Sequence, residues 1–209
     1  MEVERSTNNV MVSDRQLSKL ALSRRLLILV FFLGPCLLPG QTRHISDFSE
    51  FALGYSVIHE QLPEGYPYTP FFAYAKFPVF RQLLEKNKKL KVYVEPQLVL
   101  NNPPLSFPIN YEFGINAGLL IQQPLSIKNG FTLSLGAGPH FISLETEMQA
   151  NGFIFSDNFE LGFYQQFWEN TGLSVKSRFR HISNAGLQDP NLGIDNLFVL
   201  IGFFWNSFR

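Results

Sequence analysis

Apolar and polar side chains alternate with a period of two along most of this chain. Between residues 89 and 100, Leu, Val and Pro occupy the even positions, and Lys, Tyr, Glu and Gln occupy the odd positions as far as residue 97. The same alternation appears in residues 110–122 and 130–141, where the second face consists mainly of polar residues and glycine. Because successive side chains of a strand point to opposite faces, this pattern predicts strands with one apolar face and one polar or small face.

Five further segments show the features of strands, and they bring the predicted total to about eight. These segments are residues 51–58, 70–81, 158–167, 172–183 and 195–208. Most are close to the roughly 9–11 residues with which a tilted strand crosses a bilayer. Only residues 80–90 offer a weak helical alternative.

The connections between the predicted strands alternate in length, which bears on where they lie. Those near 82–88, 123–129 and 168–171 are short. Most of the others are longer, namely those near 59–69, 101–109, 143–157 and 184–194. Short periplasmic turns and longer external loops are typical of outer-membrane barrels. The pattern therefore predicts an all-β fold, an eight-stranded antiparallel transmembrane β-barrel of the outer membrane.

A secreted, lipocalin-like barrel is the soluble alternative, in which the apolar face would point inward. Charged residues make up 16% of the chain, against about 25% in ordinary soluble domains. The second face is polar but poorly charged, whereas a surface facing water would carry more Lys and Asp. We therefore expect the apolar face to contact lipid and the polar face to line the interior, where His140 is expected to be hydrogen-bonded. The aromatic content of 15%, with 22 Phe, suits girdles at the two membrane interfaces.

Residues 1–40 have the pattern of a signal peptide. Basic residues ending in Arg24 and Arg25 precede an unbroken apolar run over residues 26–33, which Gly and Pro follow. This arrangement is typical of a signal peptide, and the run is shorter than the roughly 20 apolar residues of a membrane-spanning helix. An ordinary buried helix is the alternative. We expect residues 1–40 to be removed, with Met1 or Met11 as the start, and residues 41–209 to form one barrel domain.

Charge and cysteine content exclude several classes of function. Lys plus Arg and Asp plus Glu each number 17, so the formal net charge is zero. A nucleic-acid-binding protein would carry a basic surface, so no nucleic-acid partner is expected. The single Cys excludes an intramolecular disulfide and a cysteine-rich metal site.

One segment combines residue types that carry ester chemistry. His181 and Ser183 are two residues apart, so their side chains share one face of the predicted strand, which is the mainly apolar face. Asp195 opens the next strand on its apolar face. In an acyl-transfer triad, His accepts the Ser proton and a carboxylate orients the imidazole. Asn184, Asn191 and nearby backbone N–H groups are candidates to stabilise an oxyanion. The alternative is a polar, turn-forming loop at the membrane interface.

These residues carry a resemblance to a known family. Residues 181–186, His-Ile-Ser-Asn-Ala-Gly, and residues 190–195, Pro-Asn-Leu-Gly-Ile-Asp, resemble the C-terminal signature of the PagL-type lipid A 3-O-deacylases, also grouped as acyloxyacyl hydrolase-like outer-membrane proteins. The close similarity covers roughly the last 35 residues, and the barrel pattern extends it loosely over residues 41–209. Asp195 stands where other members of the family have Glu.

The resemblance implies a serine esterase of the outer membrane whose active site faces lipid. Its substrate would be the lipid A of lipopolysaccharide, from which it would remove the ester-linked 3-hydroxyacyl chain at position 3. His181 matches the general base, Ser183 the nucleophile, and Asn184 and Asn191 the asparagines near the oxyanion. No metal and no other cofactor is implied. The sequence assigns neither the acyl-chain pocket nor the oligomeric state.

Two other functions remain open from the sequence. Outer-membrane phospholipases also use His-x-Ser-Asn in a barrel, but they depend on calcium and have about twelve strands. Residues 41–209, which remain after removal of the signal peptide, are too few for twelve strands and their loops. The other alternative is a small barrel without enzymatic activity. If the N-terminus of the barrel is periplasmic, strand 172–183 ends externally, and the three triad candidates then lie at the outer leaflet.

Overall fold

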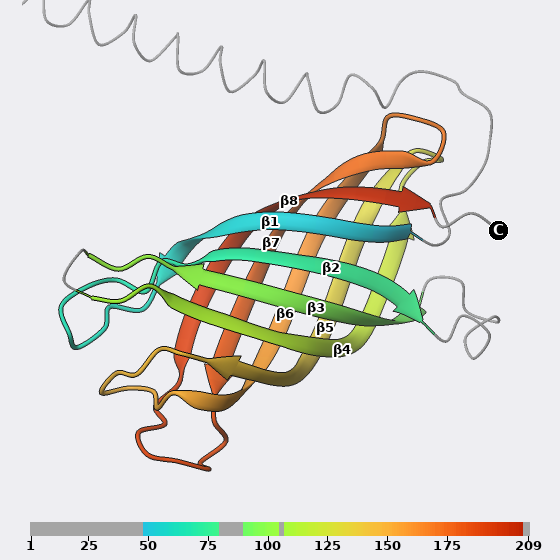
Figure 1. Cartoon of the computed structure of the whole chain (residues 1–209). Coiled ribbons are helices and arrows are strands. Elements are labelled where there is room, and N and C mark those ends of the chain that lie inside the picture. The colour runs from blue at the N-terminus through green and yellow to red at the C-terminus, as the bar shows by residue number, and fades with distance from the viewer. Residues whose placement is uncertain (1–47, 80–89, 105–106, 207–209) are drawn as a thin grey trace, which may run out of the picture. The chain divides into compact units, whose positions relative to one another are not determined.

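The computed structural model describes residues 48–79, 90–104 and 107–206, which form a closed antiparallel barrel (Figure 1). Its eight strands follow one another around the barrel in chain order, and β8 pairs with β1 to close it. The strands are β1 (Phe48–His59), β2 (Phe71–Val79), β3 (Leu90–Asn101), β4 (Asn110–Pro124), β5 (Asn129–Ile142), β6 (Gly152–Gln166), β7 (Thr171–Ser183) and β8 (Ile194–Asn206). The predicted fold class is confirmed.

Strand β6 is the element whose predicted start differs most from the structure. It begins at Gly152, six residues before the predicted start at residue 158, so the preceding connection is shorter than expected. The cause is Asp157, an acid in the row of outward positions that Phe153, Phe155 and Phe159 otherwise fill. The signal peptide predicted over residues 1–40 and the weak helical pattern predicted over residues 80–90 lie outside the described residues, except for Leu90, which opens β3.

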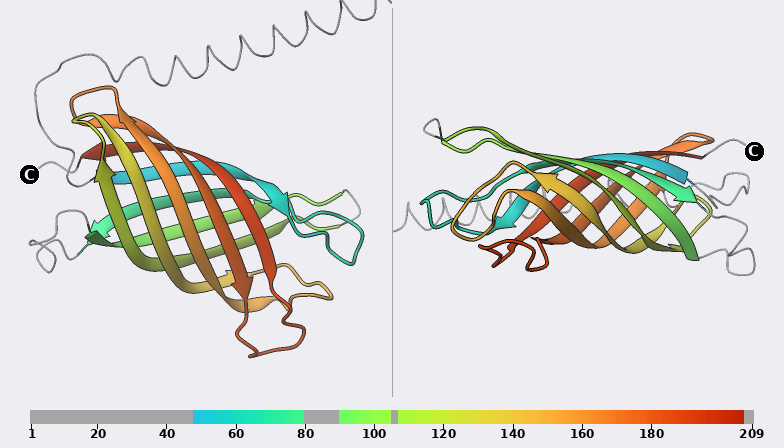
Figure 2. Two further views of the ribbon diagram at one scale, coloured as in Figure 1. Left: turned by 180° about the vertical axis from the view of Figure 1, so that it is seen from behind. Right: turned by 60° about the horizontal axis from the view of Figure 1, so that its bottom comes forward.

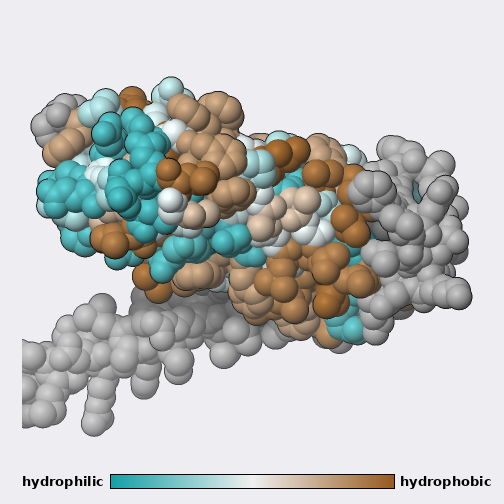
Figure 3. Space-filling view, turned by 90° about the horizontal axis from the view of Figure 1, so that it is seen from below, coloured by the Kyte–Doolittle hydropathy of each residue, from teal (hydrophilic) through white to brown (hydrophobic). Residues whose placement is uncertain are grey.

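The barrel is apolar outside and polar inside, as the alternation predicts. On β3, for example, Lys91, Glu95 and Gln97 are buried, while Leu98 and Leu100 are more than 40% exposed. Figure 3 shows hydrophobic residues over much of the strand surface and hydrophilic residues gathered toward one end. No helix in the described part of the chain is long and apolar enough to cross a membrane.

Ion pairs that extend across the interior hold opposite walls of the barrel together. Arg178 donates from Nη1 to Glu95 Oε1 at 2.7 Å and from Nε to Glu160 Oε2 at 2.9 Å. Lys76 donates to the second oxygen of Glu160 at 2.7 Å. These side chains are almost completely buried, so each charge depends on its partners, because an unpaired buried charge is strongly destabilising.

A second polar group lies directly behind the end of β7. Arg180 pairs with Glu112, and the two ring nitrogens of His140 contact Glu112 Oε1 at 2.6 Å and Asn116 Oδ1 at 2.9 Å. His140 is therefore an interior, hydrogen-bonded histidine, as predicted. This network ties β7 to β4 and β5 at the level where β7 ends.

The two ends of the barrel differ, as Figures 1 and 2 show. Phe48 and Asn206 pair at the end with the short turns, and the longer connections gather at the other end. There the strand ends and connections enclose an apolar cluster, which consists of Leu62, Tyr66, Tyr68, Ile142, Leu144, Ile154, Ile182 and Ile194. This cluster closes the polar interior behind the residues singled out by the sequence.

Candidate active site

His181 and Asp195 face each other across neighbouring strands on the outer surface of the barrel. They are register partners in the β7–β8 pair, and their side chains are 38% and 53% exposed. His181 Nδ1 lies 2.7 Å from Asp195 Oδ1. Because an ionised carboxylate only accepts hydrogen bonds, Nδ1 carries the proton and Nε2 is left as the basic nitrogen.

Ser183 lies two residues beyond His181 at the end of β7, and it is half-buried. Within the described residues its hydroxyl makes no hydrogen bond, so none joins it to His181. Catalytic hydrogen bonds are often long in unliganded proteins and tighten when substrate binds. The structure thus places the three residues predicted from strand parity on one outer patch, and it joins two of them directly.

Gly193 provides the surface on which the imidazole of His181 lies. Its φ is +80°, a conformation that favours glycine. A Cβ atom there would lie 2.6 Å from His181 Cε1 and 3.0 Å from the carbonyl oxygen of Ile182. Gly193 therefore sets the position of the ring through a close backbone approach.

The two asparagines of the following loop differ in what their side chains do. Asn184 is buried, its Nδ2 donates to the Gln188 carbonyl at 2.5 Å, and its Oδ1 accepts from Gly186 N at 3.0 Å. Its side-chain amide is therefore committed to the loop. Asn191 accepts from Asn184 N through Oδ1 at 2.7 Å, and its Nδ2 has no partner in the described residues. Asn191 therefore has an Nδ2 with both donors free for a ligand, whereas Asn184 is buried and its Nδ2 already donates to the loop.

The connection between β5 and β6 holds Asn191 in place. Gln149 forms an isolated β-bridge with Asn191. Ala150 N donates to the Pro190 carbonyl at 2.9 Å, and Leu192 N donates to the Met148 carbonyl at 2.8 Å. Asn191 is thus flanked on both sides by backbone hydrogen bonds to another loop, which limits its freedom to move.

Asp157 is a fourth polar residue on this patch, and the sequence analysis missed it. It is the register partner of His181 on β6, it is exposed, and its carboxylate has no partner in the part of the chain that the structure describes. The signal that identifies it is an acid at an outward position of a lipid-facing strand. The position of Asp157 can be recognised as outward only when the bounds of β6 are known.

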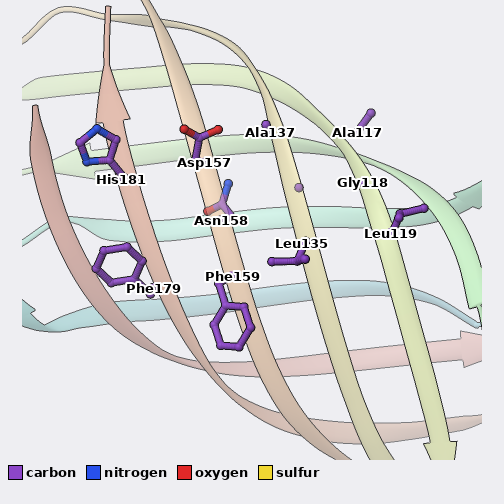
Figure 4. A pocket seen from close by; sticks show the side chains of 11 residues that line it. Ala117, Gly118, Leu119, Leu135, Ala137, Asp157, Asn158, Phe159, Phe179 and His181 are labelled. Atoms are coloured by element: carbon purple, nitrogen blue, oxygen red, sulfur yellow. The ribbon is translucent and has the colours of Figure 1, made fainter. Parts of the chain in front are cut away.

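A hollow of about 490 Å³ extends from His181 and Asp157 along the outer surface (Figure 4). Beyond Asp157 the hollow is lined by two small residues, Ala137 and Ala117, and larger apolar residues lie beside them. The larger residues are Phe179, Phe159, Leu135 and Leu119. The patch therefore adjoins a groove that suits an extended apolar chain. Among the described residues, no group of three or more His, Cys, Asp or Glu is placed to hold a metal ion.

Comparisons with known proteins identify the family of this chain. Residues 81–204 match the lipid A 3-O-deacylase (PagL) family. The chain belongs to this family. The resemblance seen in residues 181–195 is thereby confirmed, and this PagL-family protein is an enzyme of the outer membrane that hydrolyses ester bonds. None of the curated proteins compared with it matches significantly.

Solved structures show the same fold at low sequence identity. The crystal structure of the outer membrane enzyme PagL aligns with a TM-score of 0.54 and 16% identity, over 74% of this chain and 97% of that one. Neisserial surface protein A aligns with a TM-score of 0.55 and 10% identity, over 78% and 97%. At these identities the two structures establish the barrel and leave the roles of individual residues to the geometry.

We expect Gly193→Ala to lower the kcat of this PagL-family enzyme about 100-fold while the barrel still folds. The added Cβ displaces the ring of His181, the residue that the family resemblance assigns as the general base, and a shift of about 1 Å in such a group costs a factor of that order. The measurement is fatty-acid release from lipopolysaccharide micelles by the purified enzyme.

Gly186→Ala is the matched control for this prediction. Gly186 also has a positive φ, of +77°, but no atom lies within 4 Å of its ideal Cβ. The two variants share the strain of a positive φ, and only Gly193→Ala meets the ring of His181 and, less closely, the carbonyl oxygen of Ile182. Equal losses of activity in both would show that loop strain is the cause and would contradict the role given to Gly193.

Proposed function

We propose that Ser183, His181 and Asp195 form the triad with which this PagL-family protein hydrolyses the 3-O-acyl ester of lipid A on the lipid-facing side of the barrel. The observation that carries the proposal is the 2.7 Å contact between His181 Nδ1 and Asp195 Oδ1 on the outer surface. Polar side chains are costly on a face that contacts lipid. A hydrogen-bonded His–Asp pair beside an unpartnered Ser at that face therefore calls for a chemical purpose.

In this mechanism His181 acts first as a base and then as an acid. Its Nε2 takes the proton of Ser183 as Oγ attacks the ester carbonyl, and Asp195 stabilises the imidazolium. When the tetrahedral intermediate collapses, the bond between the acyl carbon and the sugar oxygen breaks, and His181 gives the proton to that oxygen, which leaves as a hydroxyl group. Water, activated by the same nitrogen, then hydrolyses the acyl-enzyme and releases the fatty acid.

Asn191 is the oxyanion donor in this proposal, and Asn184 is its support. Asn191 Nδ2 is available, while its Oδ1 is fixed by the backbone N–H of Asn184. The side-chain amide of Asn184 itself donates to the Gln188 carbonyl. A donor held in place before the reaction stabilises the developing charge without reorganisation.

The depth of the site in the membrane suits lipid A. The triad lies at the end of the barrel where the long connections gather, and long connections are external in outer-membrane barrels. With residues 1–40 removed on export, the N-terminus of the barrel would lie in the periplasm. The ester would then meet Ser183 laterally in the outer leaflet, and polar residues cost least near this interface.

Asp157 lies where its carboxylate can accept a hydrogen bond from the acyl chain, close to the ester carbonyl of that chain. It lies one strand spacing, about 4.8 Å, from His181 along the groove. Its unpartnered carboxylate accepts hydrogen bonds only. The 3-hydroxyl group of a 3-hydroxyacyl chain is a donor a few bonds from the ester, so Asp157 favours hydroxylated chains over unsubstituted ones.

The family match favours this function over the two alternatives. A non-enzymatic barrel leaves the His181–Asp195 pair on the lipid face without a purpose. The calcium-dependent phospholipase class is separated by assaying the purified enzyme in detergent micelles with and without a chelator. Full activity with the chelator supports the deacylase, and complete loss that calcium restores supports the phospholipase class.

Ser183→Ala and His181→Ala are expected to lower deacylation by several orders of magnitude, because the members of a triad act as a unit. Asp195→Asn should be impaired, and Asp195→Glu should be tolerated because it restores the family's residue. Mass spectrometry of lipid A from cells with each variant gives the readout, and heat-modifiable mobility on gels verifies folding. Near-full activity of purified Ser183→Ala or His181→Ala would refute the triad.

Asn191→Ala is expected to lower kcat by about 10²–10³-fold, the usual cost of one oxyanion donor, with little change in KM. Asn184→Ala removes two hydrogen bonds inside the loop, so it should lower activity and also make residues 184–193 more sensitive to protease. Limited proteolysis beside steady-state kinetics separates the two roles. If Asn191→Ala also became protease-sensitive and Asn184→Ala did not, the assignments would have to be exchanged.

Asp157→Asn is expected to reduce the preference for a 3-hydroxyacyl chain, because a neutral amide is a weaker acceptor than a carboxylate. The assay compares kcat/KM for synthetic lipid A precursors that carry a hydroxylated or an unsubstituted chain of equal length at position 3. An equal loss on both substrates would mean that Asp157 acts on His181 and not on the hydroxyl group.

A further inference from the structure

The position of Asp195 depends on the backbone of β8, because its side chain has little support of its own. It is the second residue of the strand, and its side chain is 53% exposed. Among the described residues, its carboxylate has no hydrogen-bond or ion-pair partner other than His181 Nδ1. Strand ends without further contacts fray. The inner face of β8 is therefore where the residue that orients the imidazole can be fixed.

Asn196 follows Asp195 directly and points into the barrel, where it is 2% exposed. Its Nδ2 donates to Ser56 Oγ at 3.2 Å and to the Tyr68 carbonyl at 3.1 Å. Ser56 belongs to β1, and Tyr68 belongs to the connection between β1 and β2. An amide nitrogen has two N–H groups, so both are used. Asn196 thereby joins the start of β8 to two other segments of the chain.

The contact with Ser56 lies at a β-bulge. The register of β1 and β8 shifts between Ser56 and Ile58, so that Val57 is an extra residue of β1 at this point. Ser56 fixes the bulge, because its Oγ donates to the Ile58 carbonyl at 3.0 Å while it accepts from Asn196. Bulges are common beside active sites, where they redirect side chains. This one holds a hydroxyl group within reach of the strand that carries Asp195.

Two adjacent register pairs of β7 and β8 face opposite sides of the barrel wall. His181 and Asp195 are the outer pair, and Arg180 and Asn196, the next pair, are buried on the inner side. Arg180 is held by Glu112 of β4, and Asn196 is held by β1 and the connection that follows it. The outer pair is thus backed by an inner pair whose members are each bonded to other elements of the barrel.

We propose that Asn196 is a positioning residue for the reaction. Its hydrogen bonds fix the start of β8, so that the Asp195 carboxylate stays within hydrogen-bonding distance of His181 Nδ1. Ile194, in the apolar cluster at this end of the barrel, also anchors the strand. Apolar burial is non-directional, however, whereas the two hydrogen bonds of Asn196 determine both position and orientation. The inference rests on the proposed triad.

The experiment uses the purified full barrel in detergent micelles with lipopolysaccharide as the substrate. Asn196→Ala keeps Asp195 but removes the two hydrogen bonds that fix its strand. We expect kcat to fall about 10- to 100-fold, because a displacement of about 1 Å in a reacting group costs up to that factor. KM should change little, since Asn196 lies on the inner face of the barrel and the substrate binds outside.

A double-mutant cycle tests whether Asn196 acts through Asp195. In the Asp195→Ala background, Asn196→Ala should cause no further loss of kcat, because the carboxylate that it positions is absent. If Asn196 only supported the barrel as a whole, the two losses would multiply, since the effects of independent sites add in free energy.

Proton NMR of the same micelles gives a readout that does not depend on activity. The Nδ1 proton of His181 is strongly deshielded while it is hydrogen-bonded to the Asp195 carboxylate. In Asn196→Ala this signal should weaken or disappear through faster exchange with water.

Asn129→Ala is the matched control. Asn129 is likewise a buried asparagine at the start of a strand, 3% exposed, and its Nδ2 donates to Gln165 Oε1 at 3.3 Å. It lies at the end of the barrel with the short turns, away from the triad. The control therefore also loses a buried amide, but its kcat and its His181 signal should stay those of the wild type. Heat-modifiable mobility on gels verifies that each variant is folded.

The outcomes separate this inference from the function on which it rests. Full activity of Asn196→Ala, equal losses in both backgrounds or an unchanged His181 signal would overturn the positioning role and leave the triad standing. If the wild type does not hydrolyse the substrate, the proposed function fails, and the NMR signal still shows whether Asn196 holds the pair together. If Asn196→Ala does not fold, Ser56→Ala replaces it in the cycle, with a smaller loss expected because one of the two acceptors remains.

Discussion

The structure depends on one constraint, which is that a strand surrounded by lipid must satisfy its backbone groups within the sheet and keep charge off its outer face. Closure of the sheet by the β1–β8 pair meets the first requirement. The period-two alternation meets the second, because it sends nearly every charge of the strands inward, where Arg178 joins Glu95 and Glu160. Against this background an outward polar side chain is exceptional, and four of them lie together near the end of β7.

Strand β7 serves the interior and the site at the same time. Arg178 and Arg180 point inward just before His181 and Ser183 point outward, and Arg180, which fixes the strand from inside, is the immediate neighbour of His181. Arg180 is held through Glu112, which also contacts His140. Such a scaffold explains how a site with no enclosing cavity keeps its geometry, because the barrel wall itself is the rigid support.

The fold and most of the site could be predicted from sequence because both follow from local patterns. Each strand shows its alternation independently of the others, and parity alone places His181, Ser183 and Asp195 on the outer face. Asp157 could not be found this way, because its relation to His181 depends on the β6–β7 register and on a strand start that Asp157 itself obscured. The groove could not be predicted from the sequence for a similar reason, since Ala137 and Ala117 are neighbours only across strands.

The same geometry bears on how an enzyme can act on a lipid without extracting it. A row of residues in register crosses strands, so its direction differs from that of the strands by about a right angle, and a chain lying along it contacts several strands at once. Its walls need only be side chains of ordinary size, with small residues in one register row between them. The groove therefore arises from differences in side-chain size between neighbouring rows of the sheet. A membrane barrel can in this way carry an extended binding surface at the outer face while its interior remains filled with the ion pairs that stabilise it.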